Sequence, residues 1–127
     1  MRLAEAHAEG GGANTYMYLF GWGHPGPNGT SWSPHGLDMP YFFDNVDKTV
    51  IAQGPQAQPL TEAMSGALIA LARTASPAHE ALPGWPAYTT DRRSTMRFDV
   101  PPAVVDDPNG AERACWDGIT LSGPDGT

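Results

Sequence analysis

The residues with the clearest potential for chemistry lie in the stretch SPHGLDMPYFFDN, residues 33–45. It places His35 after a proline, Asp38 three positions further on, and then a run of aromatic side chains. An imidazole titrates close to neutral pH, so His35 is the residue here best suited to take up and return a proton. A single histidine on a loop is commonly just a polar side chain, so its role depends on the residues around it.

Two other kinds of site can be drawn around His35. His24, His35 and Asp38 carry groups that bind zinc, but a glycine-rich loop separates the histidines and no fourth ligand is in view. We therefore expect no metal, and nothing indicates a cofactor. A dyad of His35 with Ser31 or Ser33 would provide a nucleophile, but no donors for an oxyanion are evident nearby. A small esterase built on such a dyad is kept as a third hypothesis, behind the two that follow below.

The charge of the chain bears on its partners. Fourteen Asp and Glu residues oppose seven Lys and Arg residues, which gives a net charge of −7, and no run of basic residues occurs. A surface that binds nucleic acid needs clustered Lys and Arg to neutralise phosphates. Nucleic acid is therefore not an expected partner.

Cysteine content and hydropathy bear on the environment of the protein. Cys115 is the only cysteine, so an internal disulfide cannot form. The first residues show no signal peptide in this reading frame, and no stretch approaches the ~20 apolar residues of a membrane span. We expect no membrane association, and although the sequence does not specify the compartment, these features favour the cytoplasm.

Glycine and proline, 15 and 13 of 127 residues, predict a loop-rich domain. Residues 15–20 (TYMYLF) form a continuous apolar run of β-prone residues, which predicts a strand buried in a sheet with helices on both sides. Residues 95–100 alternate in polarity and predict an edge strand. Between the first strand and His35, the glycine and proline content predicts no regular structure.

Helical periodicity is clearest at residues 60–74, which predict one amphipathic helix. Shorter helices are predicted at residues 2–9 and after a turn at residues 107–110. A lone buried strand cannot satisfy its backbone N–H and C=O groups. The pattern therefore indicates an α/β fold with an incomplete sheet.

Several segments occur in an order that resembles the C-terminal portion of type B carboxylesterases, an α/β-hydrolase group that includes para-nitrobenzyl esterases and cholinesterases. In chain order these segments are YMYLF, HGLDMPYFFDN, ALART, WPAY, MRFD and DDPNGAERACW. Each is short, but the collinear set spans residues 2 to 116. The resemblance implies the C-terminal part of an α/β-hydrolase fold over residues 1–117, followed by a flexible tail at residues 118–127.

The resemblance also implies roles for single residues. Such enzymes use a serine, an acidic residue and a histidine, and His35 matches the histidine, which acts as general base. Asp38 matches the acidic position just after it and is expected to support the histidine through backbone or water contacts. The candidates for the wall of the substrate pocket are aromatic residues near this motif: Trp22, Trp32, Tyr41 and Phe42.

The expected nucleophile is missing from the chain. The serine of α/β-hydrolases lies in a Gly-x-Ser-x-Gly elbow, and no serine of this sequence has both glycines. We therefore expect a segment of a carboxylic-ester hydrolase that supplies the triad histidine toward a small-molecule ester and is inactive alone. The alternative is a non-catalytic module that self-associates or pairs with a complementary chain through its exposed strand.

The end of the main helix carries one further expectation. The family commonly has glycine where this chain has Ala75, directly after the helix at residues 60–74. With alanine there, either a left-handed position costs on the order of 1 kcal/mol or the helix ends differently.

Overall fold

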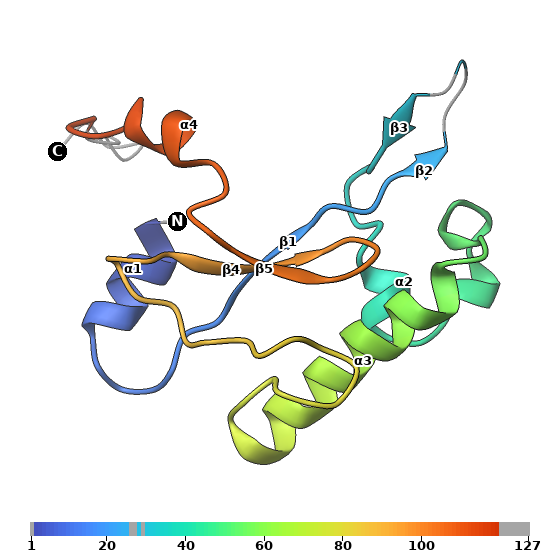
Figure 1. Ribbon diagram of the computed structural model, residues 1–127, viewed down its shortest axis with the longest axis horizontal. Helices are drawn as coiled ribbons and strands as arrows, with labels where there is room; N and C mark the ends of the chain where they lie inside the picture. The colour runs from blue at the N-terminus through green and yellow to red at the C-terminus, as the bar shows by residue number, and fades with distance from the viewer. Residues whose placement is uncertain (1, 26–27, 29, 120–127) are drawn as a thin grey trace, which may run out of the picture.

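A three-stranded sheet lies at the centre of the molecule (Figure 1). The structure is a computed structural model that describes residues 2–25, 28 and 30–119. The strands are β1 (Met17–Phe20), β4 (Ser94–Phe98) and β5 (Ala103–Asp106), in the order β1-β4-β5. β1 runs parallel to β4, and β5 runs antiparallel to it. A small mixed sheet with helices beside it confirms the predicted class, part of an α/β fold.

The two predicted strands hold the opposite positions from those expected. Residues 15–20 are predicted to be buried and residues 95–100 to lie at an edge, but β1 is the edge strand and β4 is central. Tyr18 and Leu19 of β1 are 38% and 36% exposed, whereas all of β4 except Arg97 is buried. The prediction is wrong because the apolar character of a segment does not determine how many strands pair with it. Among the described strands, β1 pairs with β4 alone.

The longest helix, α3 (Ala57–Thr74), lies beside the sheet (Figure 1). It contains the predicted helix at residues 60–74 and begins earlier, with Pro59 in its first turn, where the missing N–H breaks no helical hydrogen bond. The two shorter predicted helices are confirmed as α1 (Arg2–Glu9) and α4 (Gly110–Ala114).

The segment between β1 and α3 contains more structure than the sequence predicts. β2 (His24–Pro25) and β3 (Ser31–Trp32) form a short antiparallel pair, so the expectation of no regular structure before His35 is wrong. Gly23 permits the pairing, because a Cβ there would lie 1.9 Å from the Ser31 Oγ atom. The elements that follow are α2 (Met39–Phe42) and two short 3-10 helices, η2 (Val46–Lys48) and η3 (Val50–Ala52).

The hydrophobic core lies between one face of the sheet and the helices α2 and α3. Met96 and Phe98 of β4 reach this face together, because side chains two positions apart in a strand point the same way. The other buried core residues are Leu37, Tyr41, Ala52, Ala57, Leu60, Met64 and Ala67. On the opposite face, the paired residues Leu19 and Arg97 are exposed. Helices are predicted to cover both faces of the sheet, but at Leu19 and Arg97, both described residues, this second face is open.

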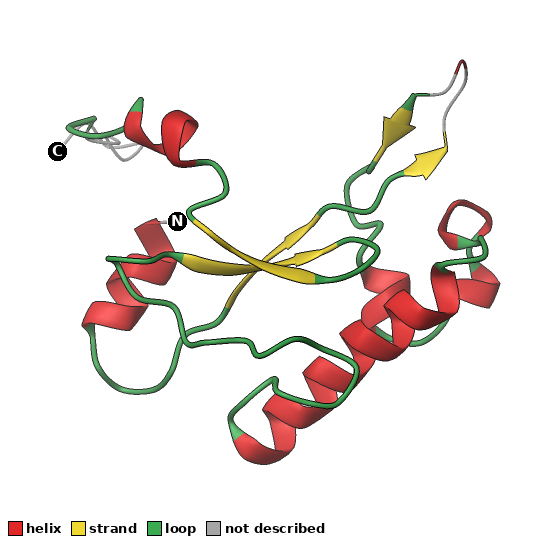
Figure 2. Cartoon of the chain, in the orientation of Figure 1, coloured by secondary structure: helices red, strands yellow, loops and turns green. Residues whose placement is uncertain are grey.

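A loop-rich connector leads from α3 back to β4 (Figure 2). His79 fixes it to the helix, since its Nε2 donates a hydrogen bond of 2.9 Å to the Ala63 carbonyl. The His79 ring lies so close to α3 that a Cβ on Gly66 would be 2.6 Å from its Cε1 atom. Further along, the Trp85 ring meets Phe98 edge-on at 5.6 Å. The connector is thus packed, although it has no helix or strand.

Ala75 ends α3 in the left-handed conformation, one of the helix ends that the sequence allows. Its φ and ψ are 57° and 21°, and its amide donates to the Leu71 carbonyl at 2.9 Å. This conformation suits glycine, because a Cβ crowds the following carbonyl oxygen.

Most of the predicted C-terminal tail lies outside the described residues. Of the predicted tail at residues 118–127, residues 120–127 lie outside the described residues, so the division at residue 117 stays a prediction.

Within the described part of the chain, no helix is both long and apolar enough to cross a membrane.

Replacing Ala75 with glycine should raise the free energy of unfolding by about 1 kcal/mol, because the Cβ clash at positive φ disappears. Urea denaturation of the two proteins measures the difference. The matched control is Ala72→Gly, which places the same change at an exposed helical position and should lower stability by up to about 1 kcal/mol. If both variants lose stability equally, Ala75 is not left-handed in solution.

Candidate active site

His35 lies on a tight turn between β3 and α2. The Leu37 amide donates to the Pro34 carbonyl at 3.1 Å, and the Met39 amide donates to the Gly36 carbonyl at 3.2 Å. Gly36 has a φ of 77°, a value that glycine adopts without strain. Leu37 is only 2% exposed and is packed in the core, whereas His35 is exposed. The turn therefore anchors one neighbour of His35 and leaves the imidazole accessible.

Asp38 closes this turn and contacts β1. Its backbone carbonyl accepts the Tyr41 and Phe42 amides at 3.1 Å, at the start of α2. Its carboxylate accepts a hydrogen bond of 2.8 Å from the Tyr18 hydroxyl. The Asp38 side chain thus contacts a side chain of the sheet.

Tyr18 is the residue of this region that the sequence analysis does not single out. Burial first, and then the hydrogen bond and charge of Asp38, raise the pKa of Tyr18 to about 12. Alternation along the strand offers a signal for it, because Tyr18 and Phe20 lie two positions apart in β1 and must share one face. Nothing in that alternation, however, identifies Asp38 as the partner.

The four aromatic candidates for a pocket wall are not gathered in one place. Tyr41 is fully buried, and its hydroxyl donates to the Ala52 carbonyl at 2.8 Å, so it is a core residue. Burial raises its pKa to about 12. Trp22 is half-buried with its ring 5.6 Å from Tyr41, and Trp32 is 48% exposed on β3.

An apolar groove of about 350 Å³ runs between β1, α2, α3 and the connector. The residues that line it are Tyr16, Tyr18, Met39, Phe42, Phe43, Ala67, Leu68, Leu71, Pro77 and Trp85. Among the predicted wall residues, Phe42 lines the groove, whereas Trp22, Trp32 and Tyr41 do not. His35 does not line it either, so this groove is a separate apolar surface beside the turn.

The sequence suggests two other sites around His35, a metal site and a dyad with Ser31 or Ser33, and the described residues show no contacts that would form either one. Among the described residues, no group of three or more His, Cys, Asp or Glu side chains is placed to hold a metal ion. His24 lies in β2 with its Nδ1 atom buried and unpaired within the same residues. Ser31 faces the backbone at Gly23, and no hydrogen bond joins Ser31 or Ser33 to His35 in the described part of the chain.

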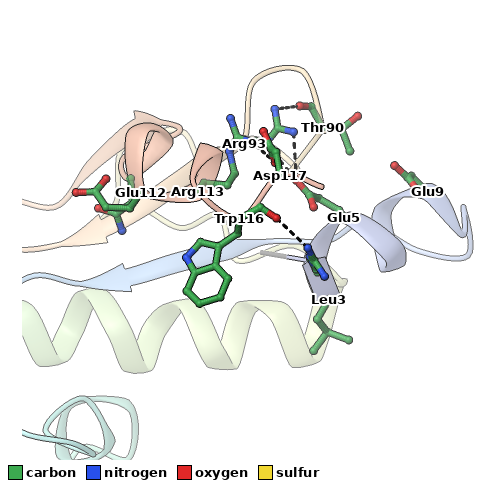
Figure 3. A pocket seen from close by; sticks show the side chains of 11 residues that line it. Leu3, Glu5, Glu9, Thr90, Arg93, Glu112, Arg113, Trp116 and Asp117 are labelled. Carbon is green, nitrogen blue, oxygen red and sulfur yellow. Dashed lines mark hydrogen bonds and ion pairs between the residues drawn. The ribbon is translucent and has the colours of Figure 1, made fainter. Parts of the chain in front are cut away.

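A cleft of about 780 Å³ opens between α1, the turn before β4 and α4 (Figure 3). Its arginines are already paired: Arg93 meets Glu5 at 3.2 Å, and Arg113 meets Asp117 at 3.7 Å. Arg113 also donates to Asp107 at 3.0 Å, and this hydrogen bond lowers the pKa of the Asp107 carboxyl. No predicted site residue lines the cleft, and its ion pairs tie α1 and α4 to the sheet.

The chain is similar to known esterases in both sequence and structure. No family model matches the chain. The para-nitrobenzyl esterase of Bacillus subtilis (strain 168) is 31% identical over 117 residues, covering 87% of this chain and 23% of that protein.

Two solved structures show the same similarity. A carboxylesterase of Geobacillus stearothermophilus superposes with a TM-score of 0.77 at 34% identity, over 91% of this chain and 24% of that one. An esterase from anaerobic Clostridium hathewayi that can hydrolyse aliphatic aromatic polyesters gives a TM-score of 0.71 at 31% identity, over 77% of this chain and 20% of that one. The chain thus spans less than a quarter of the length of each relative.

Raising the pH from about 10 to above 12 should lower the free energy of unfolding through Tyr18 and Tyr41. Each has its pKa raised from 10.0 to about 12, so between these values the folded state keeps a proton that the unfolded state has lost. This contribution is fully present below pH 10 and is lost as the pH rises through the folded pKa.

Denaturation at several alkaline pH values, together with the ultraviolet absorbance of tyrosinate, measures the effect. Tyr18→Phe should flatten part of the slope of stability against pH, and Tyr16→Phe, which changes another tyrosine of the same groove, is the matched control. Titration of every tyrosine of the folded protein near pH 10 would contradict the prediction.

Proposed function

Because the chain belongs to the type B carboxylesterase family and spans less than a quarter of the length of its relatives, we propose that it supplies the histidine of an ester-hydrolase active site. His35 has that role in this proposal. The observation that supports it is the placement of His35: an exposed imidazole on a turn that Leu37 anchors in the core. A general base needs this combination of access and fixed position.

His35 would act on a serine from the rest of the enzyme, since this sequence has no Gly-x-Ser-x-Gly elbow. The neutral imidazole takes the proton of the serine hydroxyl as the serine attacks the ester carbonyl. The imidazolium then returns that proton to the departing alcohol. In the second half of the reaction the same group activates the water that hydrolyses the acyl-enzyme.

The substrate in this proposal is a small-molecule carboxylic ester, and no cofactor takes part. Trp22 and Trp32 lie on the segment that leads to the turn, where Trp22 is half-buried and Trp32 is 48% exposed, so they are the proposed wall residues. Tyr41 contributes from the core by fixing α2 through its bond to Ala52. The chain alone is expected to be inactive because it has neither the serine nor the triad acid.

A chimera tests the role of His35. Residues 2–116 replace the matching segment of the Bacillus subtilis para-nitrobenzyl esterase, and hydrolysis of a para-nitrophenyl ester is followed. His35→Ala should lower kcat about a thousand-fold or more, because the serine then has no base. The control His7→Ala removes another exposed histidine and should change kcat by less than about two-fold.

Circular dichroism of each chimera separates lost chemistry from lost folding. Where the long replacement does not fold, residues 33–45 are grafted alone, which keeps the core of the relative, and the same histidine variant is made. A folded chimera that keeps its activity in the His35→Ala variant rules out His35 as the general base.

We propose, as a second function, a non-catalytic module that self-associates or pairs with a complementary chain, because one specific feature favours it. β1 has a strand partner on one side only among the described residues, and the apolar groove opens beside it. Leu68 and Leu71 of α3 line the groove and are each 39% exposed. An unpaired strand edge beside apolar side chains is a surface suited to strand addition.

Light scattering of the purified chain tests this second function. Association is expected, and Leu68→Glu should abolish it by placing a charge in the groove. The matched control Gln58→Glu adds the same charge at an exposed position of α3 and should leave association unchanged. A monomer at all concentrations that also fails to bind the remaining part of the related esterase contradicts the proposal.

A further inference from the structure

Among the described residues, Tyr18 is the one side chain that joins the His35 turn directly to the three-stranded sheet by a hydrogen bond. It lies in β1, an edge strand of that sheet, and its hydroxyl donates to the Asp38 carboxylate at 2.8 Å. Asp38 is the third residue after His35 and also the start of α2. The hydrogen bond therefore acts at the end of the same turn that carries the imidazole.

Ring contacts hold Tyr18 in the orientation that this bond needs. Its ring meets Phe42 of α2 edge-on at 5.2 Å and lies 5.8 Å from Phe98 of the central strand. Aromatic pairs at these distances prefer such tilted arrangements. The phenol is thus fixed on two sides, and its hydroxyl has little freedom to leave Asp38.

The acceptor of this bond is a carboxylate. A hydrogen bond to an ionised carboxylate is shorter and stronger than one between neutral groups. It is also the second anchor of the turn, the first being Leu37, which is 2% exposed. With Leu37 fixed by packing and Asp38 by Tyr18, the backbone that carries His35 has few alternative positions.

We propose that Tyr18 is a positioning residue that holds Asp38 and thereby fixes the turn that presents His35. The inference rests on the proposed function of His35 and adds a named residue to it. Tyr18 itself does not touch the substrate in this scheme. Tyr16, just before β1, provides an internal comparison, because it lines the same groove but contacts the Trp85 ring and makes no side-chain hydrogen bond within the described residues.

Amide hydrogen exchange of the chain tests the structural half of the proposal. Tyr18→Phe should increase exchange at Leu37 and Phe42 about ten-fold, because loss of a hydrogen bond to a charged group opens the turn. Exchange at Met96 in the central strand should stay the same. Tyr16→Phe should leave all three amides unchanged.

Kinetics in the esterase chimera test the functional half. Tyr18→Phe and Asp38→Asn should each lower kcat about ten-fold with KM unchanged, and the double variant should be no slower than either single variant. A merely structural role would lower the amount of folded enzyme and leave kcat per folded molecule the same. Tyr16→Phe is again the control and should keep the kcat of the parent chimera.

The outcomes separate this inference from the function on which it rests. If His35→Ala stays active, the proposed function fails. If His35→Ala is inactive while Tyr18→Phe keeps the parent exchange rates and the parent kcat, the function stands and the positioning role of Tyr18 is overturned. Additive losses in the double variant also overturn it, because two residues that act through one hydrogen bond cannot contribute independently.

Discussion

The packing around Phe98 is the contact on which the rest of this structure depends. Phe98 is fully buried in the central strand, and its ring meets three others: Tyr18 of β1 at 5.8 Å, Phe42 of α2 at 6.0 Å and Trp85 of the connector at 5.6 Å. One side chain thus holds an edge strand, a short helix and a long loop. Burial of such rings is among the largest favourable contributions that a small core can contain.

This cluster explains how a chain so rich in glycine and proline can present a defined turn. α2 is a single turn of helix and could not persist without packing, since short helices are marginal in water. Phe42 and Tyr41 attach it to the sheet, and Leu37 attaches the residues before it. The rigidity around His35 therefore comes from side chains in the core and from tight turns, while the imidazole itself stays exposed.

The parts of the fold that could be predicted are those set by neighbours in the chain. The helix at residues 60–74 follows from its 3.6-residue period, and the left-handed end at Ala75 is one of the helix ends that the sequence allows. The β2–β3 pair is not predicted, because strands of two residues carry too few positions to show a period, and the four residues of β5 do not alternate in polarity. The edge and central positions predicted for β4 and β1 are the reverse of those in the structure, because a strand's place in a sheet depends on which segments pair with it.

The candidate site divides in the same way. The residue types and the order of the motif around His35 are local properties, so the sequence alone predicts the histidine and the acidic residue after it as site residues and indicates the family. Tyr18 contacts the Asp38 carboxylate at 2.8 Å and the Phe98 ring at 5.8 Å, and only folding brings these distant positions of the chain together. Pattern reports what each segment prefers, whereas hydrogen bonding between strands and ring packing select which segments meet.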